Sequence, residues 1–185
     1  MSNAIEYANV PTQHRYNGQV FPQIVVNNDG CKTVEETVMF IQQNQAELEA
    51  QLAISGALLF RGFPLNSAET FDIFSAGFGY ANFTYKESLS NAVRINFTER
   101  VFTANEAPKD VEIFLHHEMA QTPISPSKVF FYCQSAADEG GATPLCRSDK
   151  LFEALKAENP TLASDFAEKG LKYTTTMPAA DDANS

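Results

Sequence analysis

Phe114-Leu115-His116-His117-Glu118-Met119 lies near the middle of this 185-residue chain and combines two imidazoles with one carboxylate. The composition of Val111–Met119 predicts a β-strand. Because side chains alternate between the two faces of a strand, His116 and Glu118 would share one face and His117 would point to the other. The spacing therefore places one imidazole and one carboxylate side by side.

A histidine and a carboxylate on one face supply two neighbouring ligands for a divalent metal. With a second histidine from elsewhere, they would complete the two-histidine, one-carboxylate triad of non-haem iron(II) oxygenases. Three ligands on one face leave adjacent positions for a chelating 2-oxo acid and for dioxygen. A histidine and an acid at this spacing also occur as ordinary polar features of strands, so the pair alone leaves both interpretations open. For His117 we expect a packing contact or a hydrogen bond instead of a metal.

Three further motifs flank the pair. Arg100-Val101-Phe102-Thr103-Ala104-Asn105-Glu106-Ala107-Pro108 precedes it, and Pro126-Ser127-Lys128-Val129-Phe130-Phe131-Tyr132-Cys133 and Gly140-Gly141-Ala142-Thr143-Pro144 follow it. Taken alone, the double glycine is equally well explained as a tight turn. In this order, the motifs resemble the taurine dioxygenase and clavaminate synthase-like family, especially its branch with Glu as the acidic ligand. The resemblance covers roughly residues 55–185.

The resemblance implies a fold, an activity and roles for three residues. The fold would be a double-stranded β-helix (jelly roll) with flanking helices and the metal inside the mouth of the barrel. His116 and Glu118 would bind iron(II), and Thr143 would hydrogen-bond the carboxylate of 2-oxoglutarate. With dioxygen as the other cosubstrate, such an enzyme couples decarboxylation of 2-oxoglutarate to oxidation of a C–H bond in a small-molecule substrate.

The chain lacks two residues that the family carries late in its sequence. The family's third ligand is a histidine late in the chain, followed by an arginine that pairs with 2-oxoglutarate, but no histidine follows His117 here. We therefore interpret residues 20–185 as the N-terminal part of a single oxygenase domain that lacks its C-terminal half, after a polar, irregular segment at 1–19. These residues alone are expected to be inactive. The alternative is a non-catalytic remnant that keeps the half-fold without metal-dependent turnover.

Periodicity along the chain predicts an α+β protein that is mainly β. Thr33 and Glu36 form a capping-box pattern at the start of a long helix, and a stripe of three phenylalanines in a second helix predicts core packing. We expect helices from Thr33 to Gly56, from Ser67 (with Phe71, Phe74 and Phe78 inward), from Ser148, and from Pro160 to Gly170. We expect strands at Val20–Val26 (interrupted by Pro22), Ala57–Phe60, Ala92–Phe97, Val111–Met119, Lys128–Cys133 and Leu171–Met177.

The composition of the chain disfavours some classes of binding partner. A formal net charge of −10 disfavours nucleic acid and anionic membrane surfaces, because like charges repel. The apolar runs are far shorter than a membrane span, and three scattered cysteines do not make a disulfide framework. We expect a cytoplasmic protein that acts on a small molecule, with no nucleic-acid or membrane partner. The sequence sets no oligomeric state.

Overall fold

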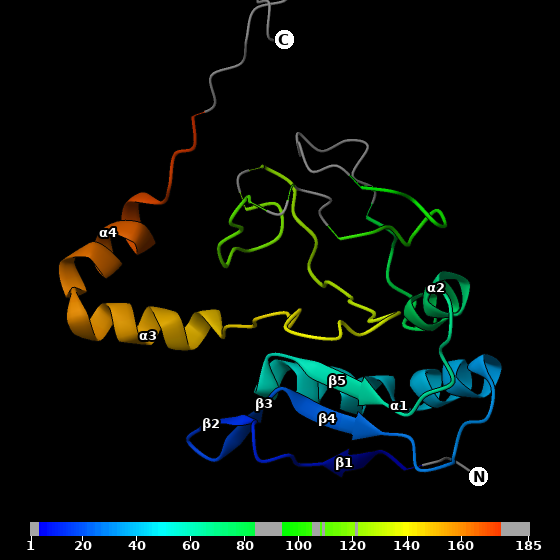
Figure 1. Cartoon of the computed structure of the whole chain (residues 1–185). Coiled ribbons are helices and arrows are strands. Elements are labelled where there is room, and N and C mark those ends of the chain that lie inside the picture. The colour runs from blue at the N-terminus through cyan, green and yellow to red at the C-terminus, as the bar shows by residue number, and fades with distance from the viewer. Residues whose placement is uncertain (1–3, 84–93, 105–107, 109, 121, 175–185) are drawn as a thin grey trace, which may run out of the picture.

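The computed structural model describes residues 4–83, 94–104, 108, 110–120 and 122–174. Within them the chain is mixed α/β, with helices and small sheets (Figure 1). No helix in these ranges is long and apolar enough to cross a membrane. The elements follow in the order β1 (Glu6–Ala8), β2 (His14–Tyr16), β3 (Gln19–Phe21), β4 (Gln23–Val26), α1 (Val34–Ser55), β5 (Leu58–Arg61), α2 (Ala68–Ala76), α3 (Ser148–Glu158) and α4 (Pro160–Lys169).

The central sheet has the strand order β1-β4-β5, and β2 and β3 form a separate antiparallel pair. β1 runs antiparallel to β4, whereas β4 and β5 are parallel, with Ile24 opposite Leu59. Parallel neighbours need a crossover connection, and α1 provides it between β4 and β5. Figure 1 shows α3 and α4 to the left of the strands, after a long segment whose described residues form no helix or named strand.

α1 begins and ends where the sequence predicts. The Thr33 side chain accepts a hydrogen bond from the Glu36 N–H at 3.3 Å, and the Glu36 carboxylate accepts one from the Thr33 N–H at 3.3 Å. These reciprocal bonds satisfy donors that the first helical turn leaves open. At the other end Gly56 has a φ of 82°, a left-handed conformation that glycine adopts without strain.

An aromatic cluster forms the core between α1, β5 and α2. Phe60 of β5 meets the rings of Phe74 and Phe78 edge-on, at centroid distances of 5.2 and 6.2 Å. Ile41 and Leu48 of α1 are fully buried beside them. Ser67 caps α2 as predicted, and Phe71, Phe74 and Phe78 are buried, which confirms that their stripe is core packing.

One expectation for the N-terminal part is wrong and another is confirmed. Residues 1–19 were expected to be irregular, but β1 and β2 lie within them. The strand expected at Val20–Val26 was predicted to be interrupted by Pro22, and the structure has β3 before Pro22 and β4 after it, in different sheets. Proline has no N–H to donate to a ladder, so it interrupts a strand.

The expectation of a mainly β chain is wrong for the described residues. α1 alone, with 22 residues, is longer than the five strands together. The described parts of the strands expected at Ala92–Phe97, Val111–Met119, Lys128–Cys133 and Leu171–Met177 contain only an isolated bridge, Asn96 to Phe102; residues 92, 93 and 175–177 lie outside the described ranges. Composition favours an extended backbone, but a strand also needs a hydrogen-bonded neighbour.

Side chains nevertheless alternate between inward and outward at Lys128–Cys133, where a strand was expected. Phe130 and Tyr132 pack against the core, with ring centroids 5.4 Å from Phe78 and 5.2 Å from Phe71 respectively. Val129 and Phe131, which alternate with them along the chain, are exposed. The segment therefore has the side-chain alternation of a strand, even though no ladder forms in the described residues.

Many large apolar side chains after residue 94 are exposed. In this part of the chain the buried hydrophobic residues are few, whereas exposed ones occur in every described segment. They include Ile95, Phe97, Val111, Ile113, Phe114, Leu115, Ile124, Val129, Phe131, Leu145, Leu151, Phe152, Leu162, Phe166, Leu171 and Tyr173. This surface contrasts with the closed core around α1, β5 and α2.

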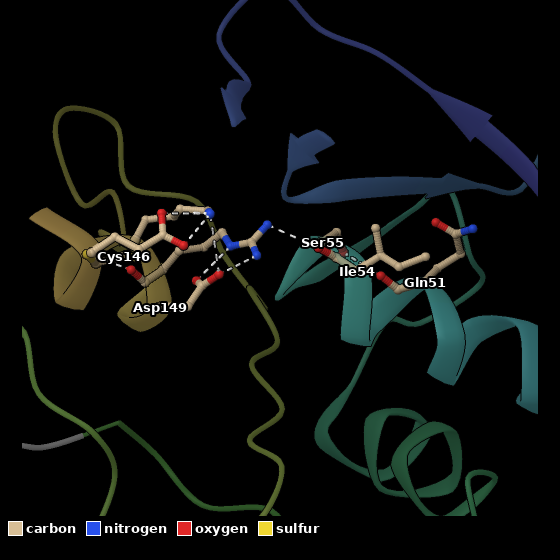
Figure 2. Close-up of polar contacts among 8 residues, drawn as sticks. Gln51, Ile54, Ser55, Cys146 and Asp149 are labelled. Atoms are coloured by element: carbon tan, nitrogen blue, oxygen red, sulfur yellow. Dashed lines mark hydrogen bonds and ion pairs between the residues drawn. The ribbon is translucent and has the colours of Figure 1, made fainter. Parts of the chain in front are cut away.

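The buried side chain of Arg147 joins the end of α1 to the start of α3. Its guanidinium donates to the Ile54 carbonyl at 3.0 Å and to both carboxylate oxygens of Asp149 at 3.0 and 2.7 Å (Figure 2). The hydrogen bond from Arg147 holds the pKa of the Asp149 carboxyl below its ordinary value. The last turn of α1 has no basic residue of its own, so Arg147 supplies the positive charge favoured at a helix C-terminus.

Replacing Phe74 by Ala should destabilise the fold by about 3–5 kcal/mol, because it leaves a cavity where three aromatic rings meet. Chemical denaturation with a CD or fluorescence signal measures this loss. Ile73→Ala on the same helix is the matched control, since Ile73 is 44% exposed and should cost much less. Equal losses for the two variants would contradict the placement of the core.

Candidate functional site

A cavity of about 710 Å³ lies between α2, the 94–104 segment and residues 125–134. Its lining combines aromatic side chains with charged ones. Among them are Phe71, Phe130, Tyr132, Arg94, Arg100 and Glu118. A partly apolar hollow with a few charged groups is the common form of a small-molecule site.

The 94–104 segment is a short hairpin-like loop that forms one wall of the cavity. The N–H of Thr103 donates to the Ile95 carbonyl at 2.9 Å, and the N–H of Phe97 donates to the Val101 carbonyl at 2.9 Å. Arg100 joins the loop to α2 through an ion pair with Asp72 at 3.3 Å. The loop is therefore fixed both internally and against the helix.

Glu118 lies in this cavity beside Arg94. A guanidinium nitrogen of Arg94 is 3.3 Å from the Oε1 of Glu118, and the two side chains are only 18% and 19% exposed. The same guanidinium donates to the Thr103 carbonyl at 3.4 Å and lies 5.2 Å from the centre of the Phe102 ring. The carboxylate is thus held in a wall that is largely shielded from water.

His116 lies two residues before Glu118 and is exposed to solvent. Its Nδ1 is 2.7 Å from the Phe114 carbonyl oxygen. In the tautomer that carries the proton on Nδ1, this contact is a hydrogen bond and Nε2 has the lone pair. Metal-binding histidines usually donate their second ring N–H to a carbonyl or carboxylate in this way. The donor chemistry of His116 and Glu118, one imidazole and one carboxylate, suits iron(II).

His117 makes a different contact. Its Nε2 is 2.6 Å from the Ser148 hydroxyl at the start of α3. Of the two contacts expected for His117, packing or a hydrogen bond, the structure shows a hydrogen bond. This bond joins the segment that contains Glu118 to the helix that follows the double glycine.

The structure does not bring all the predicted site residues to one place. Glu118 lines the cavity, but His116 and Thr143 are not among its lining residues. In the part of the chain that the structure describes, no group of three or more His, Cys, Asp or Glu side chains could hold a metal ion. The ligand assignments of His116 and Glu118 and the role of Thr143 remain predictions.

Thr143 is exposed, two residues after a glycine pair with left-handed backbone. Gly140 and Gly141 have φ values of 68° and 67°. A Cβ at Gly141 would lie 2.7 Å from the Ala137 side chain, so this position favours glycine for steric reasons as well. The alternative of a tight turn between strands stays a prediction, because the described residues around the glycine pair show a bend at 138–139 and no flanking strand.

Sequence reasoning missed Arg94. It precedes Glu118 by 24 residues, and no spacing rule joins an arginine to an acid at that separation. The Arg100–Asp72 pair, which fixes the same loop, was missed for the same reason. The Arg94–Glu118 and Arg100–Asp72 pairs become visible only once the 94–104 segment is folded against α2.

Comparisons with known proteins identify similar sequences over most of the chain. The sequence profile of the family described as "Taurine catabolism dioxygenase TauD, TfdA family" matches residues 33–182. A clavaminate synthase-like protein of Arabidopsis thaliana is 36% identical over 181 residues, which cover 95% of this chain and 54% of that protein. The dapdiamide synthesis protein DdaC of Enterobacter agglomerans is 31% identical over 122 residues, which cover 66% of this chain and 36% of that protein. The chain spans about half or less of the length of these curated relatives.

Proposed function

This chain belongs to the taurine catabolism dioxygenase TauD, TfdA family, and we propose that it forms the first half of an iron(II), 2-oxoglutarate-dependent oxygenase. The observation that carries the proposal is the family match over residues 33–182, which includes His116, Glu118 and Thr143. The reaction would couple decarboxylation of 2-oxoglutarate to oxidation of a C–H bond in a small molecule.

His116 and Glu118 would hold the iron. Two observations support this assignment: Glu118 lines the cavity, and the Nδ1 of His116 contacts a backbone carbonyl as in many metal-binding histidines. When bound, the metal with its 2-oxo acid supplies the activation of dioxygen that no side chain can perform. A third ligand would come from outside these 185 residues, since no histidine follows His117.

The cavity beside Glu118 would receive the substrate. Its aromatic walls, Phe71, Phe130 and Tyr132, would exclude water and orient a C–H bond toward the metal. The hydroxyl of Thr143 would donate a hydrogen bond to the carboxylate of 2-oxoglutarate. This role requires the exposed Thr143 segment to approach the metal in the complete domain.

The jelly roll of the complete domain is also part of the proposal. The inward alternation of Phe130 and Tyr132 and the exposed apolar side chains after residue 94 support it. Partner strands from a second half would give the extended segments their hydrogen bonds and would cover those side chains. In the described residues, no observation favours the alternative of a non-catalytic remnant.

In the full-length protein, His116→Ala should reduce succinate formation from 2-oxoglutarate to the background level, because the variant loses an iron ligand. His117→Ala should retain most of the activity, since His117 bonds to Ser148 instead. The measurement is iron-dependent succinate release with substrate in excess. Equal losses from the two substitutions would show that the wrong histidine is assigned to the metal.

Thr143→Ala should raise the KM for 2-oxoglutarate roughly tenfold to a hundredfold, because a hydrogen bond to a charged acceptor contributes about 1.5–3 kcal/mol. Thr143→Ser keeps the hydroxyl and should restore a KM close to that of the wild type. Steady-state kinetics with varied 2-oxoglutarate measures both variants. An unchanged KM in Thr143→Ala would refute a role for this hydroxyl in cosubstrate binding.

A further inference from the structure

We propose that Lys128 selects the substrate by its charge: its ammonium group binds a carboxylate or a similar anionic group on the small molecule that enters the cavity. The inference rests on the proposed function in one respect, because it takes the cavity as the substrate pocket. It adds a specificity-determining residue outside the predicted metal site. It also names the substrate class, an anion with a flat apolar body.

The cavity carries an excess of positive charge. Arg94, Arg100 and Lys128 line it, whereas Glu118 is the one acidic residue among its described lining residues. The chain as a whole has the opposite sign, with a formal net charge of −10. A positive hollow in a negatively charged protein favours anions, because the potential inside it differs in sign from that of the surrounding surface.

The two arginines of the cavity already have carboxylate partners. Arg94 pairs with Glu118 and Arg100 pairs with Asp72, each at 3.3 Å. Their charges are therefore largely compensated before a ligand enters. The ammonium of Lys128 forms no ion pair or hydrogen bond with any residue that the structure describes. Lys128 is thus the lining cation that can offer its N–H donors to an anion.

An aromatic ring holds Lys128 at the cavity. Its ammonium nitrogen lies 4.4 Å from the centre of the Tyr80 ring, and this cation–π contact attracts the charge to the face of the ring. A lysine has three N–H donors, so one such contact leaves donors for a ligand. Glu49 also attracts the ammonium, but its Oε1 accepts hydrogen bonds from Tyr80 at 2.8 Å and from Gln45 at 3.0 Å.

The contacts that place Tyr80 belong to the closed core. Its hydroxyl donates to Glu49 of α1, and its ring stacks on Phe78 with the centroids 5.9 Å apart. Phe130, two residues after Lys128, packs on both of these rings. Because these contacts form within the first half of the domain, the position of Lys128 does not depend on strands from the second half.

The aromatic wall beside Lys128 fits the apolar part of such a ligand. Lys128, Phe130 and Tyr132 alternate with exposed residues and are all half-buried, so they share one side of their segment. Tyr132 stacks on Phe71, and both line the cavity. A ligand with a ring close to a carboxylate can therefore contact an aromatic side chain and the ammonium together.

The test compares phenylacetate with 2-phenylacetamide, which has nearly the same shape without the charge. Titration calorimetry and ligand-observed NMR on the full-length protein, without added metal, give both affinities. The wild type should bind the anion about tenfold more tightly than the amide, the effect of one hydrogen bond between charged groups. Lys128→Met should abolish this preference and leave the affinity for the amide unchanged.

Three outcomes would overturn the inference. The first is equal affinity of the wild type for the two probes, including no detectable binding of either. The second is a preference that persists in Lys128→Met; if this variant does not fold, Lys128→Gln decides in the same way. The third is an equal loss of preference in Lys156→Met, the matched control, which removes one charge from the exposed side of α3. Lys128→Arg keeps the charge and should keep the preference.

The cosubstrate is another anion that Lys128 could bind, because 2-oxoglutarate carries two carboxylates. Lys128→Met should leave the affinity of the metal-loaded protein for 2-oxoglutarate unchanged. A loss of that affinity, with phenylacetate binding intact, would assign Lys128 to the cosubstrate and overturn the inference. The proposed function fails separately: a protein that forms no succinate but prefers phenylacetate through Lys128 keeps this subsite and is not an oxygenase.

Discussion

Edge-to-face packing around Phe60 is the interaction on which the rest of the described structure depends. Phe60 belongs to β5 and meets Phe74 of α2, while Phe78, just beyond α2, is in contact with both rings. The same aromatic surface continues to Phe130, which packs on Phe78. The apolar core of α1, β5 and α2 therefore also holds residues 125–134, which border the cavity. The cavity is thus positioned by packing between residues that are distant in sequence from the His–Glu motif.

The helices could be predicted from the sequence because their signals are local. The capping box at Thr33 and Glu36 and the left-handed Gly56 lie within a few residues of the bonds that they make. Strands depend on a neighbour elsewhere in the chain, and composition does not contain that information. This is why Val111–Met119 has strand composition yet no ladder in its described residues, while β1 and β2 formed in a segment that reads as polar and irregular.

The candidate site likewise contains residues that local sequence motifs identify and one that only the fold reveals. His116 and Glu118 are recognised by a spacing of two residues, and Thr143 by its place after a double glycine in a motif shared with a family. Arg94 carries no such signal, because its relation to Glu118 is made by the folding of the 94–104 loop. Local motifs thus identify the candidate ligands, whereas the ion pair between Arg94 and Glu118 is visible only in three dimensions.

The central claim is that His116 and Glu118 are two ligands of one iron(II) site, with Arg94 against the carboxylate. A crystal structure of the full-length protein, loaded with iron(II) and 2-oxoglutarate without oxygen, tests it most directly through the anomalous signal at the iron edge. We predict a single strong peak bonded to the imidazole of His116 and the carboxylate of Glu118, with the Arg94 guanidinium in hydrogen-bond contact with that carboxylate. A peak bonded to His117, or one that does not touch Glu118, would contradict the claim.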